Sequence, residues 1–222
     1  MAQGPSLTRD QFNQACDALL VDSHNLEHEI ASFRGSVGWS TVSSTLVPSL
    51  RCLERSVFVS AIANDENLMD DLLDINDGPV DEPEDVASSA PTPLGPAQLL
   101  TVKQWIVYSP SFSVPAFYFS CHDASGAPVP LDRIMRSRLF LQAISRSVRQ
   151  TPHSLEMPDN EGPFPLLSQG DHPVLGVPCW YLHPCETQRA MDELLKASAS
   201  GTLSVWLQTW LALISTTIDL RT

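Results

Sequence analysis

The stretch Leu99-Leu-Thr-Val-Lys-Gln-Trp-Ile-Val-Tyr108 is rich in β-branched and aromatic residues, a composition that predicts a β-strand. A break at Ser109-Pro110-Ser111 follows, and a second apolar run extends over residues 112–121. Pro115 lies near the start of this second run, where a strand tolerates proline. We therefore expect two consecutive strands, one on each side of the break.

The segments around these strands are predicted from hydrophobic spacing and turn signals. Apolar residues recur every three or four positions in residues 8–30, which predicts a helix. The other expectations are one or two strands in residues 39–61, a turn at 123–126, helices in 131–148 and 186–199, a loop over 162–170, a short apolar run over 172–182 and a last element over 203–220. Because helices and strands are grouped rather than regularly alternating, this order predicts an α+β fold with a mostly antiparallel sheet.

The charge of the chain is strongly negative and unevenly distributed. The 222 residues include 13 Lys and Arg against 26 Asp and Glu, which gives a net charge of −13. This sign disfavours binding to nucleic acid, whose phosphates need cationic partners, and to an anionic membrane surface. Ten of the acidic residues lie between Asn64 and Asp85, where there is no Lys or Arg, and residues rich in Pro, Gly and Ser follow.

This composition cannot bury enough apolar surface to offset the entropy of ordering. We therefore expect a single domain over residues 1–222 with a disordered acidic insertion at 64–97. Within the insertion, a short amphipathic binding helix at residues 68–73 is the alternative to a solvated acidic loop.

Three observations predict a cytoplasmic protein. The first ten residues carry no signal-peptide pattern. The longest uncharged stretch, residues 202–218, contains many hydroxyl side chains and is shorter than the roughly 20 apolar residues of a membrane span. The five cysteines are widely spread, which favours free thiols in a reducing compartment.

Residues 170–187 carry most of the side chains that could perform chemistry, namely His172, Cys179, His183 and Cys185. Their order, H-x6-C-x3-H-x-C, differs from the paired spacing of structural zinc sites, so no metal is expected. Cys179 is flanked by apolar residues and is expected in the core, as are Cys16, Cys52 and Cys121. Cys185 differs because it lies at the predicted start of a helix, where the helix dipole favours a reactive thiolate. A cysteine protease remains open, but no local signature of one surrounds Cys185.

The string His183-Pro184-Cys185-Glu186-Thr187 resembles the HPC active-site motif of the autophagy conjugating enzymes, and in particular the autophagy-related protein ten family. Four further segments resemble that family in the same order: Tyr108 to Phe119, Gly126 to Leu131, Asp171 to Gly176 and Val205 to Trp210. The resemblance covers about residues 99–218 and implies a fold like that of ubiquitin-conjugating enzymes. Phe112 stands where the family often has a second tyrosine.

The resemblance implies a transferase that needs no cofactor. An activating enzyme, autophagy-related protein seven, would present a ubiquitin-like modifier, protein twelve. Cys185 would accept that modifier as a thioester and pass it to a lysine of an acceptor, protein five. Ubiquitin-conjugating enzymes use the asparagine of an HPN motif near the thiol; none is present here, so His183 is expected as the oxyanion donor and Tyr108 as a weaker candidate. Tyr108 and Phe112 could instead belong to a surface that binds the acceptor.

Two alternatives remain open. One is the lipid-conjugating relative of the protein three type, whose membrane work would favour a basic N-terminal helix. The acidic residues Asp10, Asp17 and Asp22 of the first predicted helix argue against it. The other is a non-catalytic adaptor that docks through the acidic insertion.

Overall fold

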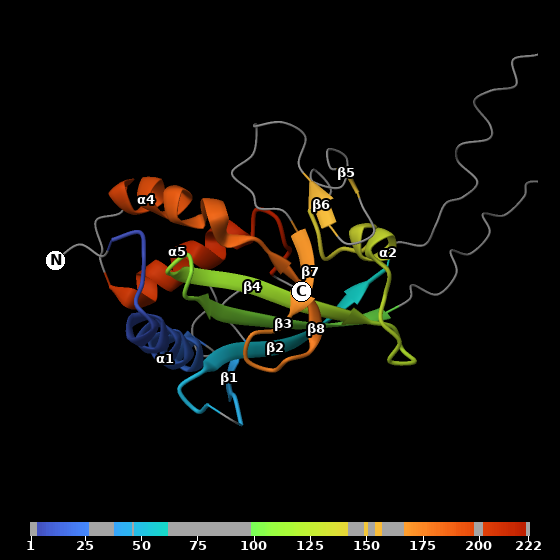
Figure 1. Ribbon diagram of the computed structural model, residues 1–222, viewed down its shortest axis with the longest axis horizontal. Coiled ribbons are helices and arrows are strands. Elements are labelled where there is room, and N and C mark those ends of the chain that lie inside the picture. Colours follow the sequence, from blue (N-terminus) through green and yellow to red (C-terminus); the bar gives the residue numbers. More distant parts are fainter. Residues whose placement is uncertain are drawn as a thin grey trace, which may run out of the picture.

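The computed structural model describes residues 4–26, 38–45, 47–61, 99–141, 149–150, 154–156, 167–197 and 202–220 (Figure 1). The expected acidic insertion at residues 64–97 lies outside the described residues. The helical elements are α1 (Arg9–Leu26), α2 (Leu131–Met135), the 3₁₀ turn η2 (Pro184–Glu186), α4 (Thr187–Ala197) and α5 (Leu203–Ile214). The strands are β1 (Ser40–Ser43), β2 (Arg51–Ser60), β3 (Leu99–Ser109), β4 (Val114–His122), β5 (Arg149–Gln150), β6 (Ser154–Glu156), β7 (Leu167–Asp171) and β8 (Pro178–Leu182).

The strands form one antiparallel sheet in the order β1-β2-β3-β4-β8-β7-β6-β5. β3 and β4 lie near its centre and pair over nine positions from Thr101↔His122 to Ser109↔Val114. These are the two strands expected at residues 99–108 and 112–121. Together with the flanking helices, they confirm the α+β fold with a mostly antiparallel sheet and its likeness to ubiquitin-conjugating enzymes.

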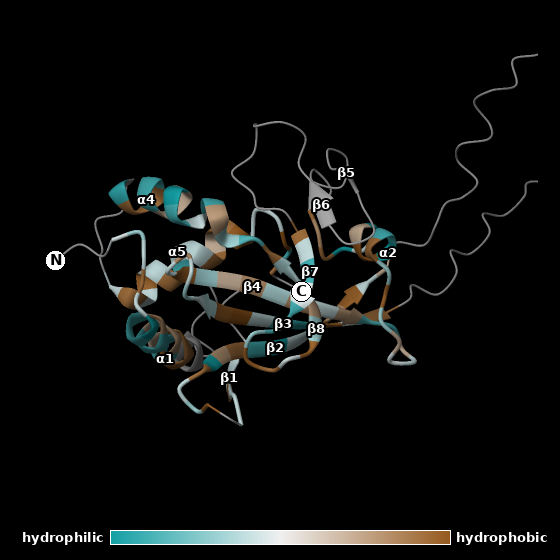
Figure 2. Cartoon of the chain, in the orientation of Figure 1, coloured by the Kyte–Doolittle hydropathy of each residue, from teal (hydrophilic) through white to brown (hydrophobic). Residues whose placement is uncertain are grey.

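The main core lies between one face of the sheet and helices α1 and α5, which pack against each other (Figure 1). Phe12 and Leu19 of α1 and Trp206 and Trp210 of α5 are fully buried there. The helical spacing of apolar residues in residues 8–30 and the aromatic residues of the last element are therefore explained by this interface. Figure 2 shows α5 as mostly hydrophobic and α4 as mostly hydrophilic, so α4 covers the core with one side only.

The opposite face of the sheet carries a smaller apolar cluster. Trp105 and Val107 are two residues apart on β3 and point to this same side, because successive residues of a strand alternate between the two faces. Cys52 and Cys179 pack with them, and the loop between β7 and β8 covers the cluster through Val174 and Leu175. This loop contains His172, one of the residues singled out for possible chemistry.

The helix expected over residues 131–148 is wrong in extent, because α2 ends at Met135. The Ser137 hydroxyl donates to the Ile134 carbonyl and accepts the N–H of Leu139, so it takes hydrogen bonds that a continuing helix would need. Ser137 then forms a β-bridge with Ala61. Residues 142–148 lie outside the described residues.

The loop expected over residues 162–170 is also wrong at its end, where β7 (Leu167–Asp171) pairs with β8. The sequence did not predict this strand, because β7 contains glycine and polar residues in place of the β-branched residues that strands favour. No helix in the described part of the chain is long and apolar enough to span a membrane.

Candidate active site

β8 leads directly into the segment that carries Cys185. The strand ends at Leu182, His183 has an extended backbone (φ −68°, ψ 125°), and η2 begins at Pro184. Proline suits the first position of a helical turn because its fixed φ is already helical and its missing N–H is not needed there. α4 continues from Thr187, so Cys185 lies in the turn that opens a helix of the main core. This confirms the helix expected at residues 186–199 and places its first turn two residues earlier.

His183 caps this turn. Its Nδ1 atom accepts a hydrogen bond from the backbone N–H of Cys185 at 3.3 Å. Because Nδ1 is the acceptor, the proton of the neutral imidazole lies on Nε2. The cap therefore leaves Nε2–H as the donor that the imidazole can offer to another group.

Two aromatic rings hold the His183 imidazole. Phe112, from the connection between β3 and β4, meets it in a T-shaped contact with ring centroids 5.2 Å apart. Tyr181, two residues earlier on β8, lies at 6.2 Å with an interplanar angle of 38°. The structure thus places Phe112 against His183 of the His183-Pro184-Cys185 motif, although the two segments are about 70 residues apart in the sequence.

Cys185 is the exposed member of the five cysteines, all of which are free thiols. The other four are buried, as expected, and burial raises the pKa of each: that of Cys121 to about 11 and those of Cys52 and Cys179 to about 12. These buried thiols are poor nucleophiles near neutral pH because the thiolate is the reactive form. Next to Cys185, the Glu186 carboxylate pairs with Arg189 at 2.8 Å, which offsets the negative charge beside the thiol.

Tyr108 lies away from this group. Its hydroxyl donates to the Leu7 carbonyl at 2.9 Å, and its ring packs on Phe12 and under the Arg9 guanidinium. Within the described ranges, no hydrogen bond or ring contact joins Tyr108 to His183 or Cys185. The geometry therefore favours a structural role for Tyr108, which ties the segment before α1 to β3.

His172 is buried and holds the β7–β8 loop. Its Nδ1 atom accepts the N–H groups of Val174 and Leu175, both at 3.1 Å, and its ring packs edge-on against Trp105 with centroids 5.0 Å apart. Burial lowers the pKa of His172 to about 4, so the ring is neutral near pH 7. Among the described residues, no group of three or more His, Cys, Asp and Glu side chains could hold a metal ion.

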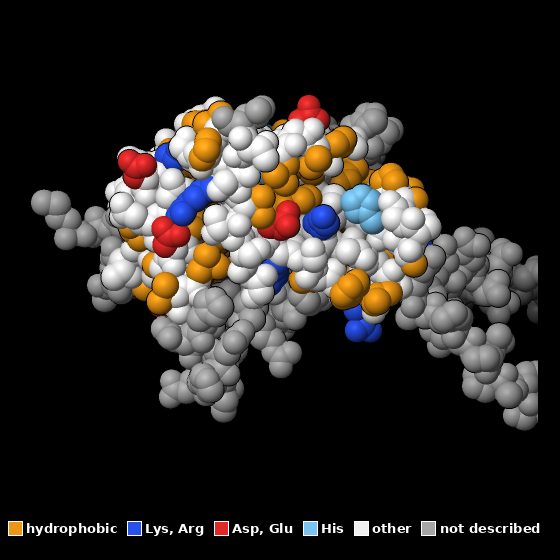
Figure 3. Space-filling model, turned by 90° about the horizontal axis from the view of Figure 1, so that it is seen from below, with side chains coloured by type: hydrophobic (Ala, Val, Ile, Leu, Met, Phe, Trp, Pro, Cys, Tyr) orange, Lys and Arg blue, Asp and Glu red, His pale blue; other side chains and the backbone are white. Residues whose placement is uncertain are grey.

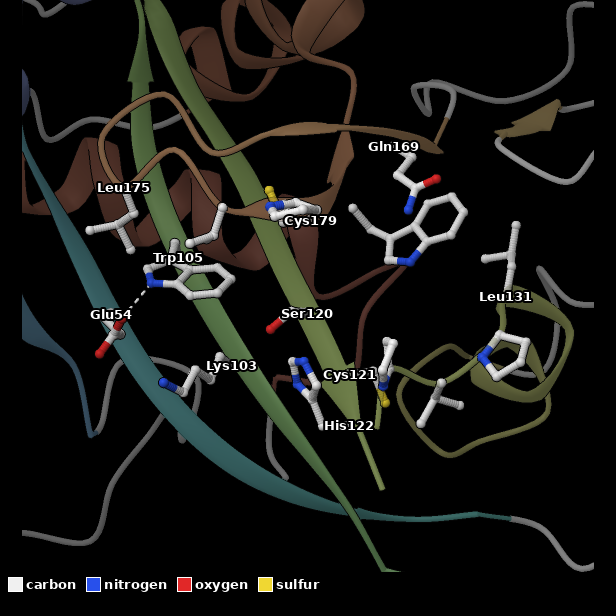
Figure 4. A pocket seen from close by; sticks show the side chains of 16 residues that line it. Glu54, Lys103, Trp105, Ser120, Cys121, His122, Leu131, Gln169, Leu175 and Cys179 are labelled. Carbon is white, nitrogen blue, oxygen red and sulfur yellow. Dashed lines mark hydrogen bonds between the residues drawn. The ribbon is translucent and has the colours of Figure 1, made fainter. Parts of the chain in front are cut away.

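A groove of about 740 Å³ lies near the start of β8, whereas Cys185 follows the end of that strand. Lys103, Ser120 and His122 line one side and Leu175 and Val177 another. Figure 4 shows the groove with the hydrogen bond from Trp105 Nε1 to Glu54, 2.5 Å long, at its edge. On the face seen in Figure 3, hydrophobic side chains gather beside acidic, basic and histidine side chains, the mixture that also lines this groove. The groove is a feature separate from the thiol.

Tyr181 was not identified from the sequence. Strand alternation offers the signal that could have found it, since residues two apart on a strand project from the same face. Tyr181 and His183 are two apart, and β8 is extended up to His183.

Comparison with known proteins adds two findings. The model of the family described as "Autophagocytosis associated protein, active-site domain" matches residues 11–222.

Three relatives are each named ubiquitin-like-conjugating enzyme ATG10. The one from Homo sapiens is 27% identical over 144 residues, which cover 64% of this chain and 57% of that protein. The one from Arabidopsis thaliana is 29% identical over 52% of this chain and 48% of that protein. The one from Schizosaccharomyces pombe is 31% identical over 62% of this chain and 66% of that protein. The matched region thus spans about half the length of the first two relatives.

Proposed function

Because the chain belongs to the family of autophagocytosis-associated proteins with an active-site domain, and its curated relatives are ATG10 enzymes, we propose that it is a ubiquitin-like-conjugating enzyme with Cys185 as its nucleophile. The observation that carries this proposal is the geometry of Cys185. It is an exposed thiol among buried ones, it lies at the start of a core helix, and His183 caps its backbone.

The proposed reaction has two steps. The activating enzyme, autophagy-related protein seven, presents the modifier, protein twelve, as a thioester at the modifier's C-terminal carbonyl. The Sγ of Cys185 attacks that carbonyl, a new C–S bond forms, and the thiolate of the activating enzyme leaves. A lysine amine of the acceptor, protein five, then attacks the Cys185 thioester, the Cys185 thiolate leaves, and the amine proton is released as the isopeptide bond forms.

His183 is proposed to stabilise the tetrahedral intermediate of this second step. The backbone N–H of Cys185 is already bonded to His183 Nδ1, so that amide is occupied. The Nε2–H of the same imidazole is the donor that this side chain can still offer. A donor aimed at a developing oxyanion typically contributes ~10²–10³ in rate.

The proposal is tested by reconstitution. The chain is mixed with activating enzyme, modifier and ATP, and run on gels with and without reductant. We expect an adduct that reductant removes, followed by an isopeptide product once the acceptor is added. The absence of any thiol-labile adduct would exclude the conjugating function and favour the adaptor.

Two features bear on the finer assignment. Acidic residues in α1, among them Asp10 and Asp17, disfavour the anionic-membrane contact that a lipid-conjugating relative would use. All five cysteines are free, so we further propose the cytoplasm as the compartment.

A further inference from the structure

We propose that Tyr181 is a positioning residue for this reaction, whose ring orients the His183 imidazole, and that Gly170 is a glycine so that this ring can lie where it does. The inference rests on the proposed function for its kinetic consequence. The orientation and tautomer of the His183 imidazole can be measured without any partner protein.

The imidazole of His183 contacts two rings, one from the connection between β3 and β4 and one from β8. Phe112 contacts it at 78° and 5.2 Å, and Tyr181 at 38° and 6.2 Å. Two such contacts restrict rotation of the imidazole about its side-chain bonds. They hold the ring in the orientation in which Nδ1 meets the Cys185 N–H and Nε2 carries the proton.

Tyr181 is itself fixed by its neighbours. It stacks on Tyr118 of the adjacent strand, with centroids 5.2 Å apart and an interplanar angle of 25°. The two residues are direct cross-strand partners in the β4–β8 register, the arrangement in which aromatic pairs stabilise a sheet. Tyr118 therefore fixes the Tyr181 ring that contacts the His183 imidazole.

Gly170 leaves room for the Tyr181 ring, because it has no side chain. A Cβ atom at Gly170 would lie 3.1 Å from Cε1 and 3.7 Å from Cδ1 of Tyr181. The φ of Gly170 is outside the left-handed region, since the positive values among the described glycines belong to Gly38, Gly126 and Gly176. A side chain at this position would therefore press on the Tyr181 ring and shift it by a few tenths of an ångström, whereas the backbone conformation of Gly170 would tolerate one.

Three variants test the proposal, each compared with the wild-type chain. Tyr181→Leu removes the ring, Tyr181→Phe keeps the ring without its hydroxyl, and Gly170→Val pushes the ring away while leaving Tyr181 in place. Gln169→Ala, next to Gly170 on β7 and exposed, is the matched control. The first readout is the ¹⁵N spectrum of the imidazoles, which reports the tautomer of His183. The second is the rate at which a pre-charged Cys185 thioester is discharged by the acceptor.

We expect the Nε2–H tautomer of His183 in the wild type, in Tyr181→Phe and in Gln169→Ala. Tyr181→Leu and Gly170→Val are expected to show a mixture of tautomers and a discharge about 3- to 10-fold slower, the factor that corresponds to one aromatic contact. A wild-type tautomer in both of these variants overturns the proposal, and so does a Tyr181→Phe variant as defective as Tyr181→Leu. If Tyr181→Leu fails to fold, Gly170→Val decides. If the wild type forms no thioester, the proposed function fails, while the spectra still decide whether Tyr181 orients His183.

Discussion

His183 Nδ1 accepts the backbone N–H of Cys185 at 3.3 Å, so this imidazole caps the turn that carries the thiol and keeps its Nε2–H as a second donor. The capping contact and the proposed chemical role therefore belong to one side chain, and each has its own consequence. Loss of an N-cap costs about 1 kcal/mol of stability, whereas loss of an oxyanion donor slows one chemical step ~10²–10³-fold.

We predict that His183→Ala slows discharge of the thioester much more than its formation. Formation can use groups of the activating enzyme, but attack by the acceptor lysine depends on groups beside Cys185. The measurement is a single-turnover assay in which the enzyme is charged, the activating enzyme is quenched, and the acceptor is added. His183→Asn, which supplies both a cap acceptor and an N–H donor, is expected to restore the melting temperature and part of the rate. Equal slowing of both steps by His183→Ala, with a lower melting temperature, would show that the role is structural only.

We predict that Cys185→Ser abolishes transfer and leaves the fold intact, because the side chain is exposed and its replacement removes no core contact. An oxyester that resists reductant can accumulate, since an alkoxide leaves less readily than a thiolate. The matched control is Cys179→Ser. Cys179 is buried and its thiol lies 3.4 Å from the Gly170 carbonyl, an acceptor that a serine hydroxyl can also use. Wild-type transfer by Cys185→Ser, or its loss in Cys179→Ser alone, would show that the nucleophile is assigned wrongly.

We predict that deleting residues 67–93 leaves the melting temperature and thioester formation nearly unchanged. Ser60 and Leu99, which flank the acidic segment, are partners on neighbouring strands, so a shorter connection can join them. Thermal unfolding and gel assays of the charged enzyme check this. A drop of several degrees would show that the segment packs on the core. A selective loss of transfer to the acceptor would instead identify it as a docking site.

The sequence predicted the elements whose residue types and periodicity agree with their surroundings. β3 and β4 are apolar because they lie at the centre of the sheet, and α1 shows helical spacing because Phe12 and Leu19 face the core. The sequence did not predict the end of α2, because the hydrogen bonds of one side chain, the Ser137 hydroxyl, replace those of a continuing helix. For the candidate site, the sequence singled out His183 and Cys185 because both belong to one short motif.

Tyr108 could not be placed from the sequence, because its contacts depend on which face of a strand its side chain occupies. Tyr181 was missed although its spacing of two residues from His183 on a strand offered a signal. Tyr108 is directed to Leu7 and α1, whereas Tyr181 stacks on Tyr118 and reaches His183. That choice is fixed by pairing across the sheet, which a single sequence does not show.

The buried ring of His172 is expected to make the stability of the protein depend on pH. In the folded protein burial lowers the pKa of His172 to about 4, whereas in the unfolded chain it is near the ordinary value of 6.5. Between these two values the unfolded state binds a proton that the folded state does not. Protonation of His172 therefore leaves the free energy of unfolding unchanged above about pH 6.5 and lowers it as the pH falls from there towards 4. Tyr118, which packs against the ring, does not interfere, because burial raises its pKa to about 12.

His172 alone is expected to reduce the free energy of unfolding by about 2 kcal/mol between pH 7.5 and pH 5. The matched variant is His172→Asn, whose side-chain oxygen can accept the N–H groups of Val174 and Leu175 as Nδ1 does, but which does not titrate. We predict that this variant is less stable at pH 7.5, because it loses the ring contacts with Trp105 and Tyr118, yet loses less stability on acidification. Urea unfolding of both proteins at the two pH values measures the difference, and titration of the carboxylates that both share cancels in the comparison. An equal loss in the two proteins would mean that His172 takes up its proton in the folded state as readily as in the unfolded chain.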